Sequence, residues 1–220
     1  MRKISISLLL ISCVFWACSG GKKVVNSPAG DVKVQLSCVA FYNLENLFDT
    51  INQENNDEEY LPEGANKWTG MKYKAKLKNM SYALSQLGLD YSPTGFAFVG
   101  VSEIENRGVL EDLIKQPALA DRGLEIVHYD SPDRRGVDVG LIYNPHQFIV
   151  TNSKSYRLHT EDSTFLTRDQ LMVSGYLQGE KVHVIVNHWP SRTGGEERSR
   201  PKRNAAAALT RSIADSLFRV

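Results

Sequence analysis

Apolar residues follow two repeating patterns along this chain, one with a period of two residues and one with a period near 3.6. Alternating or continuous apolar runs, typical of strands, occupy residues 34–42, 96–101, 124–129, 137–143, 148–156, 169–177 and 181–187. Helical spacing marks residues 72–87, 108–115 and 204–218. Because helices are interspersed among the strands, the pattern predicts an α/β protein.

A histidine stands where one of these strands stops. The run 182–186 predicts a buried strand, and Trp189-Pro190 breaks it directly after His188. A side chain at that position is held by the sheet and points from its rim, and Arg192 is close enough in sequence to meet the same ligand. The alternative is a histidine that only caps the end of the strand.

Acidic and amide side chains follow two other predicted strands. If the first strand stays extended through Glu45, then Asn43 and Glu45 project from one face. Glu103 and Glu105 follow the wholly apolar run 96–101, and their spacing of two residues also predicts a shared face. Ionised carboxylates at the end of a buried strand repel one another, which favours a bound cation.

Another carboxylate, Asp138, lies inside the apolar run 137–143 and needs a partner there. One interpretation is a structural ion pair with Arg134 or Arg135 in the preceding turn. The other is a charge in the outer shell of a functional site, next to the residues that bind its ligand. The sequence leaves both interpretations open.

Two charged segments are interpreted as solvent-exposed and without chemistry. One is the acidic loop that contains Glu54, Asp57, Glu58 and Glu59. The other is the set of lysines at positions 72, 74, 76 and 78, which step by two and therefore spread around the predicted helix. We expect these lysines to serve solubility.

The amino terminus has the pattern of an export signal. Residues 1–17 combine a basic start with an apolar segment too short to span a bilayer, and they run into Cys18. This resembles a bacterial lipoprotein signal with Cys18 as the lipidated residue; Cys13 and an ordinary cleaved signal are the alternatives. We predict an exported, membrane-anchored lipoprotein of the cell envelope or surface, with residues 18–33 as a flexible tether and 34–220 as one domain.

The charge balance restricts how such a protein can hold a polyanion. Removal of residues 1–17 takes away Arg2 and Lys3, so 24 basic residues remain against 25 acidic ones, a formal charge of −1. Bulk attraction to nucleic acid or phosphate esters is therefore excluded, and a local basic rim must hold them. Residues 192–203 provide such a rim, with five basic and two acidic side chains.

Four motifs occur in a characteristic order. They are Asn43 with Glu45, then Glu103, then Gly-Val-Asp-Val-Gly at 136–140, then Asn-His-Trp-Pro-Ser-Arg at 187–192. Together they resemble the endonuclease/exonuclease/phosphatase superfamily, the fold of DNase I and of exonuclease III-like repair nucleases. Residues 41–49 resemble the opening of its bacterial exported members. The resemblance implies a DNase I-like four-layer α/β sandwich with two packed mixed sheets.

The resemblance also implies a chemistry, namely divalent-metal-dependent hydrolysis of phosphodiesters with Mg²⁺ or Mn²⁺. It makes Glu103 the metal ligand, Glu45 a second acidic contact, and Asn43 the group that orients Glu103 and the phosphate. It makes His188 a hydrogen-bond partner of a non-bridging phosphate oxygen, with Arg192 assisting. The implied substrate is nucleic acid or another phosphodiester, and the implied state is a monomer.

The second acid of the Glu-Ile-Glu motif, Glu105, is placed behind the metal ligand, because the family uses the first acid. Family members also carry a later Gly-Asp-x-Asn motif, whose Asp activates the attacking water, and a Ser-Asp-His motif. In this sequence no Asp is followed two residues later by Asn, and none directly by His. The sequence therefore resembles the first two-thirds of a longer protein, and we expect this chain alone to be inactive on DNA.

A nuclease is the leading hypothesis from these patterns. A sugar-phosphate or lipid phosphodiesterase and a non-catalytic lipoprotein that binds phosphate-bearing ligands are the alternatives. A sandwich without its final strands is also expected to aggregate, because apolar side chains lose packing partners. The residues expected to lose them are Phe96, Phe98, Val101, Ile142 and the run 182–186.

Overall fold

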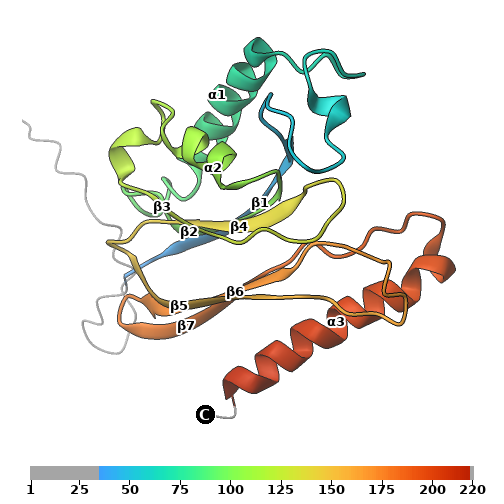
Figure 1. The fold of residues 1–220 in the computed structure, drawn as a ribbon. Coiled ribbons are helices and arrows are strands. Elements are labelled where there is room, and N and C mark those ends of the chain that lie inside the picture. The colour runs from blue at the N-terminus through green and yellow to red at the C-terminus, as the bar shows by residue number, and fades with distance from the viewer. Residues whose placement is uncertain (1–34, 219–220) are drawn as a thin grey trace, which may run out of the picture. The chain divides into compact units, whose positions relative to one another are not determined.

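The computed structural model describes residues 35–218 (Figure 1). The predicted signal, the two candidate lipidation residues Cys13 and Cys18, and the tether 18–33 lie outside the described residues. Within residues 35–218, no helix combines the length and the apolar character needed to cross a bilayer.

The first sheet contains four strands in the order β1-β2-β4-β3. The strands are β1 (Cys38–Leu47), β2 (Phe96–Ile104), β3 (Glu125–His128) and β4 (Asp138–Tyr143). β1 and β2 pair in parallel, whereas β2 with β4 and β3 with β4 are antiparallel, so the sheet is mixed. The parallel pair requires a crossover connection, which α1 (Gly70–Gln86) provides.

Two helices cover the outer face of this sheet (Figure 1). In α1, Leu77 and Leu84 are buried, and in α2 (Arg107–Ile114) Val109 and Leu113 are buried. The side chain of Asn106 caps α2, because its oxygen accepts a hydrogen bond from Val109 N at 3.0 Å. The end of β2 and the start of α2 are thereby joined through a single polar side chain.

The second sheet contains β5 (Phe148–Tyr156), β6 (Gln170–Leu177) and β7 (Glu180–Val186), all paired antiparallel. It packs on the first sheet through apolar contacts such as Phe98 against Phe148, whose ring centroids are 4.8 Å apart. α3 (Glu196–Phe218) lies on its other face (Figure 1), and Gln170 Nε2 donates to Ala206 O at 2.8 Å. The predicted four-layer α/β sandwich is confirmed; of its two sheets as described, the first is mixed and the second antiparallel.

The helices differ from the prediction in two respects. α3 begins at Glu196, earlier than the predicted 204, because the polar segment that contains Pro201 has no apolar stripe to reveal it. Two short 3₁₀ helices, at Glu58–Tyr60 and Ala120–Arg122, follow no apolar periodicity and were not predicted.

The acidic loop after β1 is solvent-exposed at Glu54, Glu58 and Glu59, as predicted, but its interpretation was wrong for Asp57. Asp57 is only 1% exposed, and its Oδ2 accepts a hydrogen bond from Gln53 N at 3.0 Å. Phe48 stacks on Tyr60, with ring centroids 4.1 Å apart. Trp68 Nε1 donates to Phe48 O at 2.9 Å. These aromatic contacts fasten the end of the acidic loop to the residue that follows β1.

The expected packing defects are not at the residues that the sequence indicated. Phe96, Phe98, Val101 and Ile142 are all buried, and the run 182–186 is half-buried or buried. Exposed apolar side chains occur instead on β1, where Val39 is 51% and Phe41 54% exposed. Phe41 lies on the side of the first sheet that faces the second sheet, beside Val186. The second sheet therefore leaves the inner face of β1 partly uncovered.

Candidate functional site

The end of β2 contains a β-bulge centred on Glu103. Ser102 and Ile104 pair with consecutive residues of β4, so Glu103 is an extra residue without an opposite partner. Its φ of 58° is left-handed, and the neighbouring end of β1 is also left-handed at Glu45 and Asn46. A non-glycine residue in this conformation costs of the order of 1–3 kcal/mol, and such bulges redirect side chains at sheet ends.

The bulge separates the two carboxylates that the sequence placed on one face. Glu103 Oε1 lies 3.3 Å from His188 Nε2. Glu105 instead is 5% exposed, and its Oε2 accepts a hydrogen bond from Asp49 N at 2.8 Å. The expectation of a shared face was wrong, because the left-handed residue interrupts the alternation of the strand.

The residues at the end of β1 are also not aligned as expected. Because Glu45 is left-handed, it does not continue the strand face of Asn43; instead, Asn43 Oδ1 accepts a hydrogen bond from Glu45 N at 2.8 Å. Lys76 donates from Nζ to Glu45 O and, at 3.3 Å, to Asn46 O. Lys76 therefore stabilises this turn, which corrects its interpretation as a solubility residue.

Glu103 and His188 line one pocket of about 640 Å³. Four basic side chains share its wall: Arg135, Arg168, Arg198 and Lys202. Asn43, Glu45 and Arg192 are not among its lining residues, although Ser191 and Thr193 on either side of Arg192 are. Of the predicted site residues, this pocket therefore contains Glu103 and His188, whereas the other three do not line it.

Arg168 holds the loop that carries His188. It donates from Nε to His188 O and from a terminal nitrogen to Trp189 O, both at 3.1 Å. Its other terminal nitrogen pairs with Asp133 Oδ2 at 3.0 Å. Its side chain is 8% exposed, so this network is shielded from water. Arg168 and Asp133 were not found from the sequence; the only signal was the position of Arg168 just before a buried strand.

The charges around His188 favour its neutral form. Burial lowers the pKa of His188 most, the positive charge of Arg168 lowers it further, and Glu103 opposes both. A neutral imidazole can donate one hydrogen bond from Nε2 without adding charge to the pocket. Lys202 stacks over the Phe165 ring at 3.8 Å, which fixes one cation at the pocket wall.

The pocket has donor chemistry that suits a divalent metal. The Glu103 side chain is 21% exposed. Mg²⁺ is usually held by one or two carboxylates, and it keeps several waters and substrate phosphate oxygens as its remaining ligands. An accessible carboxylate in a basic pocket fits that pattern, so Glu103 is the residue that would hold the ion.

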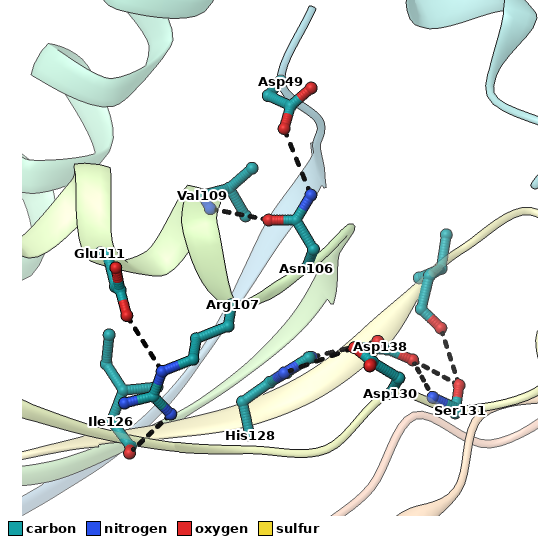
Figure 2. Close-up of polar contacts among 11 residues, drawn as sticks. Asp49, Asn106, Arg107, Val109, Glu111, Ile126, His128, Asp130, Ser131 and Asp138 are labelled. Carbon is teal, nitrogen blue, oxygen red and sulfur yellow. Dashed lines mark hydrogen bonds and ion pairs between the residues drawn. The ribbon is translucent and has the colours of Figure 1, made fainter. Parts of the chain in front are cut away.

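Asp138 is paired with a histidine rather than with an arginine (Figure 2). Its Oδ2 lies 3.1 Å from His128 Nε2, and its Oδ1 accepts hydrogen bonds from Ser131 N at 3.0 Å and from the Ser131 hydroxyl. The interpretation of Asp138 as the ion-pair partner of Arg134 or Arg135 was therefore wrong. Burial raises the pKa of Asp138, and the bonds from His128 and Ser131 oppose that rise.

The same pair belongs to a cluster whose spacing could hold a metal. His128, Asp130 and Asp138 each place a ligand atom within 4.8 Å of the others. However, both Asp138 oxygens are hydrogen-bonded, and the second ring nitrogen of His128 faces Asp130 at 3.9 Å. His128 and Ser131 thus satisfy Asp138 by hydrogen bonds, whereas the exposed Asp130 lies beyond hydrogen-bond distance of the ring.

Residues 38–220 match the model of a family described as the endonuclease/exonuclease/phosphatase family. The chain belongs to this family. Its members include nucleases and phosphatases, so membership establishes a hydrolase superfamily and leaves the substrate open. A comparison with curated protein sequences finds no match.

Solved structures share the fold at low sequence identity. A functionally unknown conserved protein from Enterococcus faecalis has a TM-score of 0.52 and 12% identity, covering 82% of this chain and 62% of its own. The mannosyl-6-phosphatase of Bacteroides thetaiotaomicron has a TM-score of 0.50 and 16% identity, and the match covers 84% of this chain and 61% of that protein. TDP2 from Caenorhabditis elegans has a TM-score of 0.48 and 15% identity, and the match covers 69% of this chain and 39% of that protein. This chain spans less than two thirds of the length of each.

Proposed function

We propose that this chain carries the metal- and phosphate-binding part of a divalent-metal-dependent phosphodiester hydrolase that acts on nucleic acid, with Mg²⁺ as the metal and Mn²⁺ as a substitute. The supporting observation is the Glu103–His188 contact inside a pocket with four basic side chains. Membership in the endonuclease/exonuclease/phosphatase family supports the reaction class.

Each group in the pocket has a role in this proposal. Glu103 holds the metal, which supplies Lewis-acid polarisation of the phosphoryl group. His188, neutral near pH 7, donates from Nε2 to a non-bridging phosphate oxygen and stabilises the charge that develops there. Arg168 keeps the His188 loop in place through its two backbone contacts. Preorganised donors of this kind supply much of the rate enhancement in enzymes.

The three predicted site residues outside the pocket lining also have proposed roles. Arg192 assists from the loop edge, between two residues that line the pocket. Asn43 orients Glu103 through the pairing of β1 with β2, where Asn43 lies opposite Ser102. Glu45 remains a second acidic contact for the metal.

The basic wall favours nucleic acid over a substrate with one phosphate. Arg198 and Lys202 are four residues apart on α3, so they lie on the same face of the helix. Both line the pocket, together with Arg135, whose Nε lies 3.5 Å from Asp133 Oδ1. A polyanion would contact several of these cations at once. A sugar phosphate is the second candidate, because the fold is shared with a mannosyl-6-phosphatase.

Binding of a labelled single-stranded oligonucleotide, followed by fluorescence anisotropy with and without Mg²⁺, tests this function. We expect Mg²⁺ to strengthen binding by about tenfold, the Glu103→Gln variant to lose that gain, and added salt to weaken binding steeply. Mannose 6-phosphate should compete poorly. Strong competition by mannose 6-phosphate would favour the sugar-phosphate candidate, and binding that ignores both Mg²⁺ and Glu103→Gln would overturn the proposal.

We also propose that the protein is exported and anchored to a membrane through Cys18. Support comes from the sequence of residues 1–18 alone. Replacing Cys18 by Ala should release the protein from the membrane fraction or stall its processing. If Cys13→Ala has this effect instead, Cys13 is the lipidated residue, and if neither variant has it, the lipoprotein hypothesis fails.

A further inference from the structure

A second pocket, of about 830 Å³, is lined by Glu105 and not by Glu103. Its wall comes from the loop after β1, including Asp49 and Asn55, from the start of α2, and from the turn at 130–136. Asn56 N donates to Arg134 O at 2.9 Å, so the loop and the turn are joined beside it. The pocket thus lies at the end of β2; it shares Asp133 and Leu166 with the His188 pocket, but it contains neither Glu103 nor His188.

Three buried oxygens at this place have no hydrogen-bond partner among the described residues. They are Glu105 Oε1 and Asn55 Oδ1, whose residues line the pocket, and Asp57 Oδ1 in the adjoining loop. Glu105 and Asp57 are 5% and 1% exposed, so water does not reach these carboxylates freely. A buried acceptor left unpaired costs about 1–3 kcal/mol, and a charged one costs more. When Glu105 is ionised, all three atoms are acceptors, so what they lack is a donor or a cation.

The neighbouring arginines do not supply a positive charge to these oxygens. Figure 2 shows the Arg107 guanidinium turned toward Glu111 and Ile126, to which it donates at 3.0 and 3.4 Å. Arg134, on the opposite wall, donates to Thr164 O at 3.2 Å. Within residues 35–218, no ion pair joins Glu105 or Asp57 to a basic side chain. The two buried carboxylates therefore lack a cationic partner.

The adjacent carboxylate, Asp49, is already satisfied and serves as a contrast. Its Oδ1 accepts from Ile51 N at 2.6 Å, and its Oδ2 accepts from Asn106 Nδ2 at 3.2 Å (Figure 2). Burial raises the pKa of Glu105 most, the charges of Asp49 and Asp57 add to the rise, and hydrogen bonding by Asp49 N and by the Asn55 amide opposes it. Asn55 and Gln53 line the same pocket as Glu105, and Gln53 N donates to Asp57 Oδ2 at 3.0 Å, so the loop brings Asp57 to this side of Glu105.

We propose that Glu105, Asp57 and Asn55 form a site for a hard divalent cation, Ca²⁺ in preference to Mg²⁺, which fixes the loop after β1 on the end of β2. Carboxylate and amide oxygens are the ligands that Ca²⁺ takes, and two carboxylates balance its charge. Ca²⁺ tolerates the irregular geometry of a loop site, whereas Mg²⁺ demands an octahedron. With few protein ligands, the Kd is expected to be on the order of 0.1–1 mM, as in extracellular modules.

Calorimetry and thermal unfolding with Ca²⁺ test this site, in a Glu103→Gln background that removes the proposed catalytic ligand. The site does not depend on the proposed hydrolase function, because Glu103 takes no part in it. We expect one equivalent of Ca²⁺ to bind and about 10 mM Ca²⁺ to raise the Tm by roughly 3–6 °C. Adding Asp57→Asn, which keeps an acceptor for Gln53 N, should abolish both effects. Glu59→Gln, at an exposed residue of the same segment that does not line the pocket, should leave them unchanged.

Cleavage by a glutamate-specific protease gives a second readout. Glu54, Glu58 and Glu59 lie in or next to the loop. Ca²⁺ should protect these bonds in the Glu103→Gln protein, and Asp57→Asn should remove the protection. If Asp57→Asn unfolds the protein, Asn55→Ala tests the same site. Absence of Ca²⁺ binding in the Glu103→Gln protein, or undiminished binding after both loop substitutions, would overturn the proposal, and an equal response to Mg²⁺ would overturn the preference for Ca²⁺.

Discussion

Glu103 and Glu105 are two residues apart in the sequence, yet they occupy contrasting environments. Glu103 is partly exposed in a pocket with four basic side chains and lies 3.3 Å from His188. Glu105 is buried under an acidic loop, and one of its oxygens has no partner among the described residues. The left-handed bulge at Glu103 produces this difference, because it redirects one carboxylate and leaves the next one in the interior.

The two environments have opposite energetic demands. At Glu103 the energetic cost is the strain of a left-handed backbone, and the carboxylate stays accessible for exchange of ligands. At Glu105 the cost lies in desolvation, which is not offset by any ion pair within the described chain. A site that must exchange substrate needs the first arrangement, whereas a permanently held ion suits the second. The proposed catalytic and structural cations follow this division.

The largest expected effect separates the two carboxylates directly. Glu103→Gln should abolish the Mg²⁺-dependent gain in oligonucleotide affinity, a loss of about tenfold, and leave the Ca²⁺-induced rise in Tm intact. Glu105→Gln should have the reverse pattern, because it removes a ligand of the proposed loop site only. Anisotropy and thermal unfolding of the two variants check this. Loss of both properties in either variant would mean that a single ion serves both carboxylates.

The next effect is a dependence of stability on pH. Burial, more than the charges of Asp49 and Asp57, raises the pKa of Glu105 from 4.5 to about 7. The folded state then holds the proton more tightly than the unfolded state. This stability is therefore present below about pH 4.5 and is lost as the pH rises to about 7, by at most about 3 kcal/mol.

Thermal unfolding in a metal-free buffer series checks this sign. The Tm should fall between about pH 5 and pH 8, Ca²⁺ should restore it at the upper end, and Glu105→Gln should flatten the profile. A Tm that rises over this interval in the parent protein and not in Glu105→Gln would show that Glu105 is ionised and favourably paired without added metal.

The strands were predictable from the sequence, and the strand ends were not. Alternation and apolar runs located β2, β4 and β7 within a few residues, because burial on a sheet leaves a local pattern. The bulge at Glu103 has no such signal, since neither glycine nor asparagine marks the left-handed residue. The predicted faces of Glu103 and Glu105 failed for this reason, whereas the meeting of Glu103 with His188 depends only on where two strands stop.

Partners that come from pairing across strands were also beyond the sequence. Asp138 meets His128 because β3 and β4 are antiparallel neighbours, with His128 opposite Gly140. A reader of the sequence sees only the adjacent arginines of the turn. Likewise, the burial of Asp57 depends on aromatic contacts of its loop, and the role of Arg168 on backbone carbonyls of a distant loop. Such contacts exist only after the sheets have packed.

A smaller effect probes the loop from the opposite wall. Gly136 has a φ of 67°, and an added Cβ would lie 2.1 Å from Asn55 Nδ2. Gly136→Ala should therefore displace Asn55 and weaken the Ca²⁺-induced rise in Tm, besides costing about 1–2 kcal/mol of backbone strain. Gly123→Ala is the matched control, because Gly123 has a φ of 59° and nothing within 4 Å of its added Cβ. An equal Ca²⁺ response in both variants would place Asn55 outside the cation site.

The smallest expected effect concerns the basic wall beside Glu103. Arg198 lies over Gly194 at the pocket edge, whereas Arg211, on the same helix, is paired with Asp215 away from the pocket. Arg198→Ala should weaken oligonucleotide binding a few-fold for every base sequence and reduce the slope of log affinity against log salt by about 1. Arg211→Ala should change neither quantity. Arg192→Ala decides the role proposed for that residue: a change like that of Arg198→Ala places it on the phosphate, and a result like that of Arg211→Ala removes it from the site.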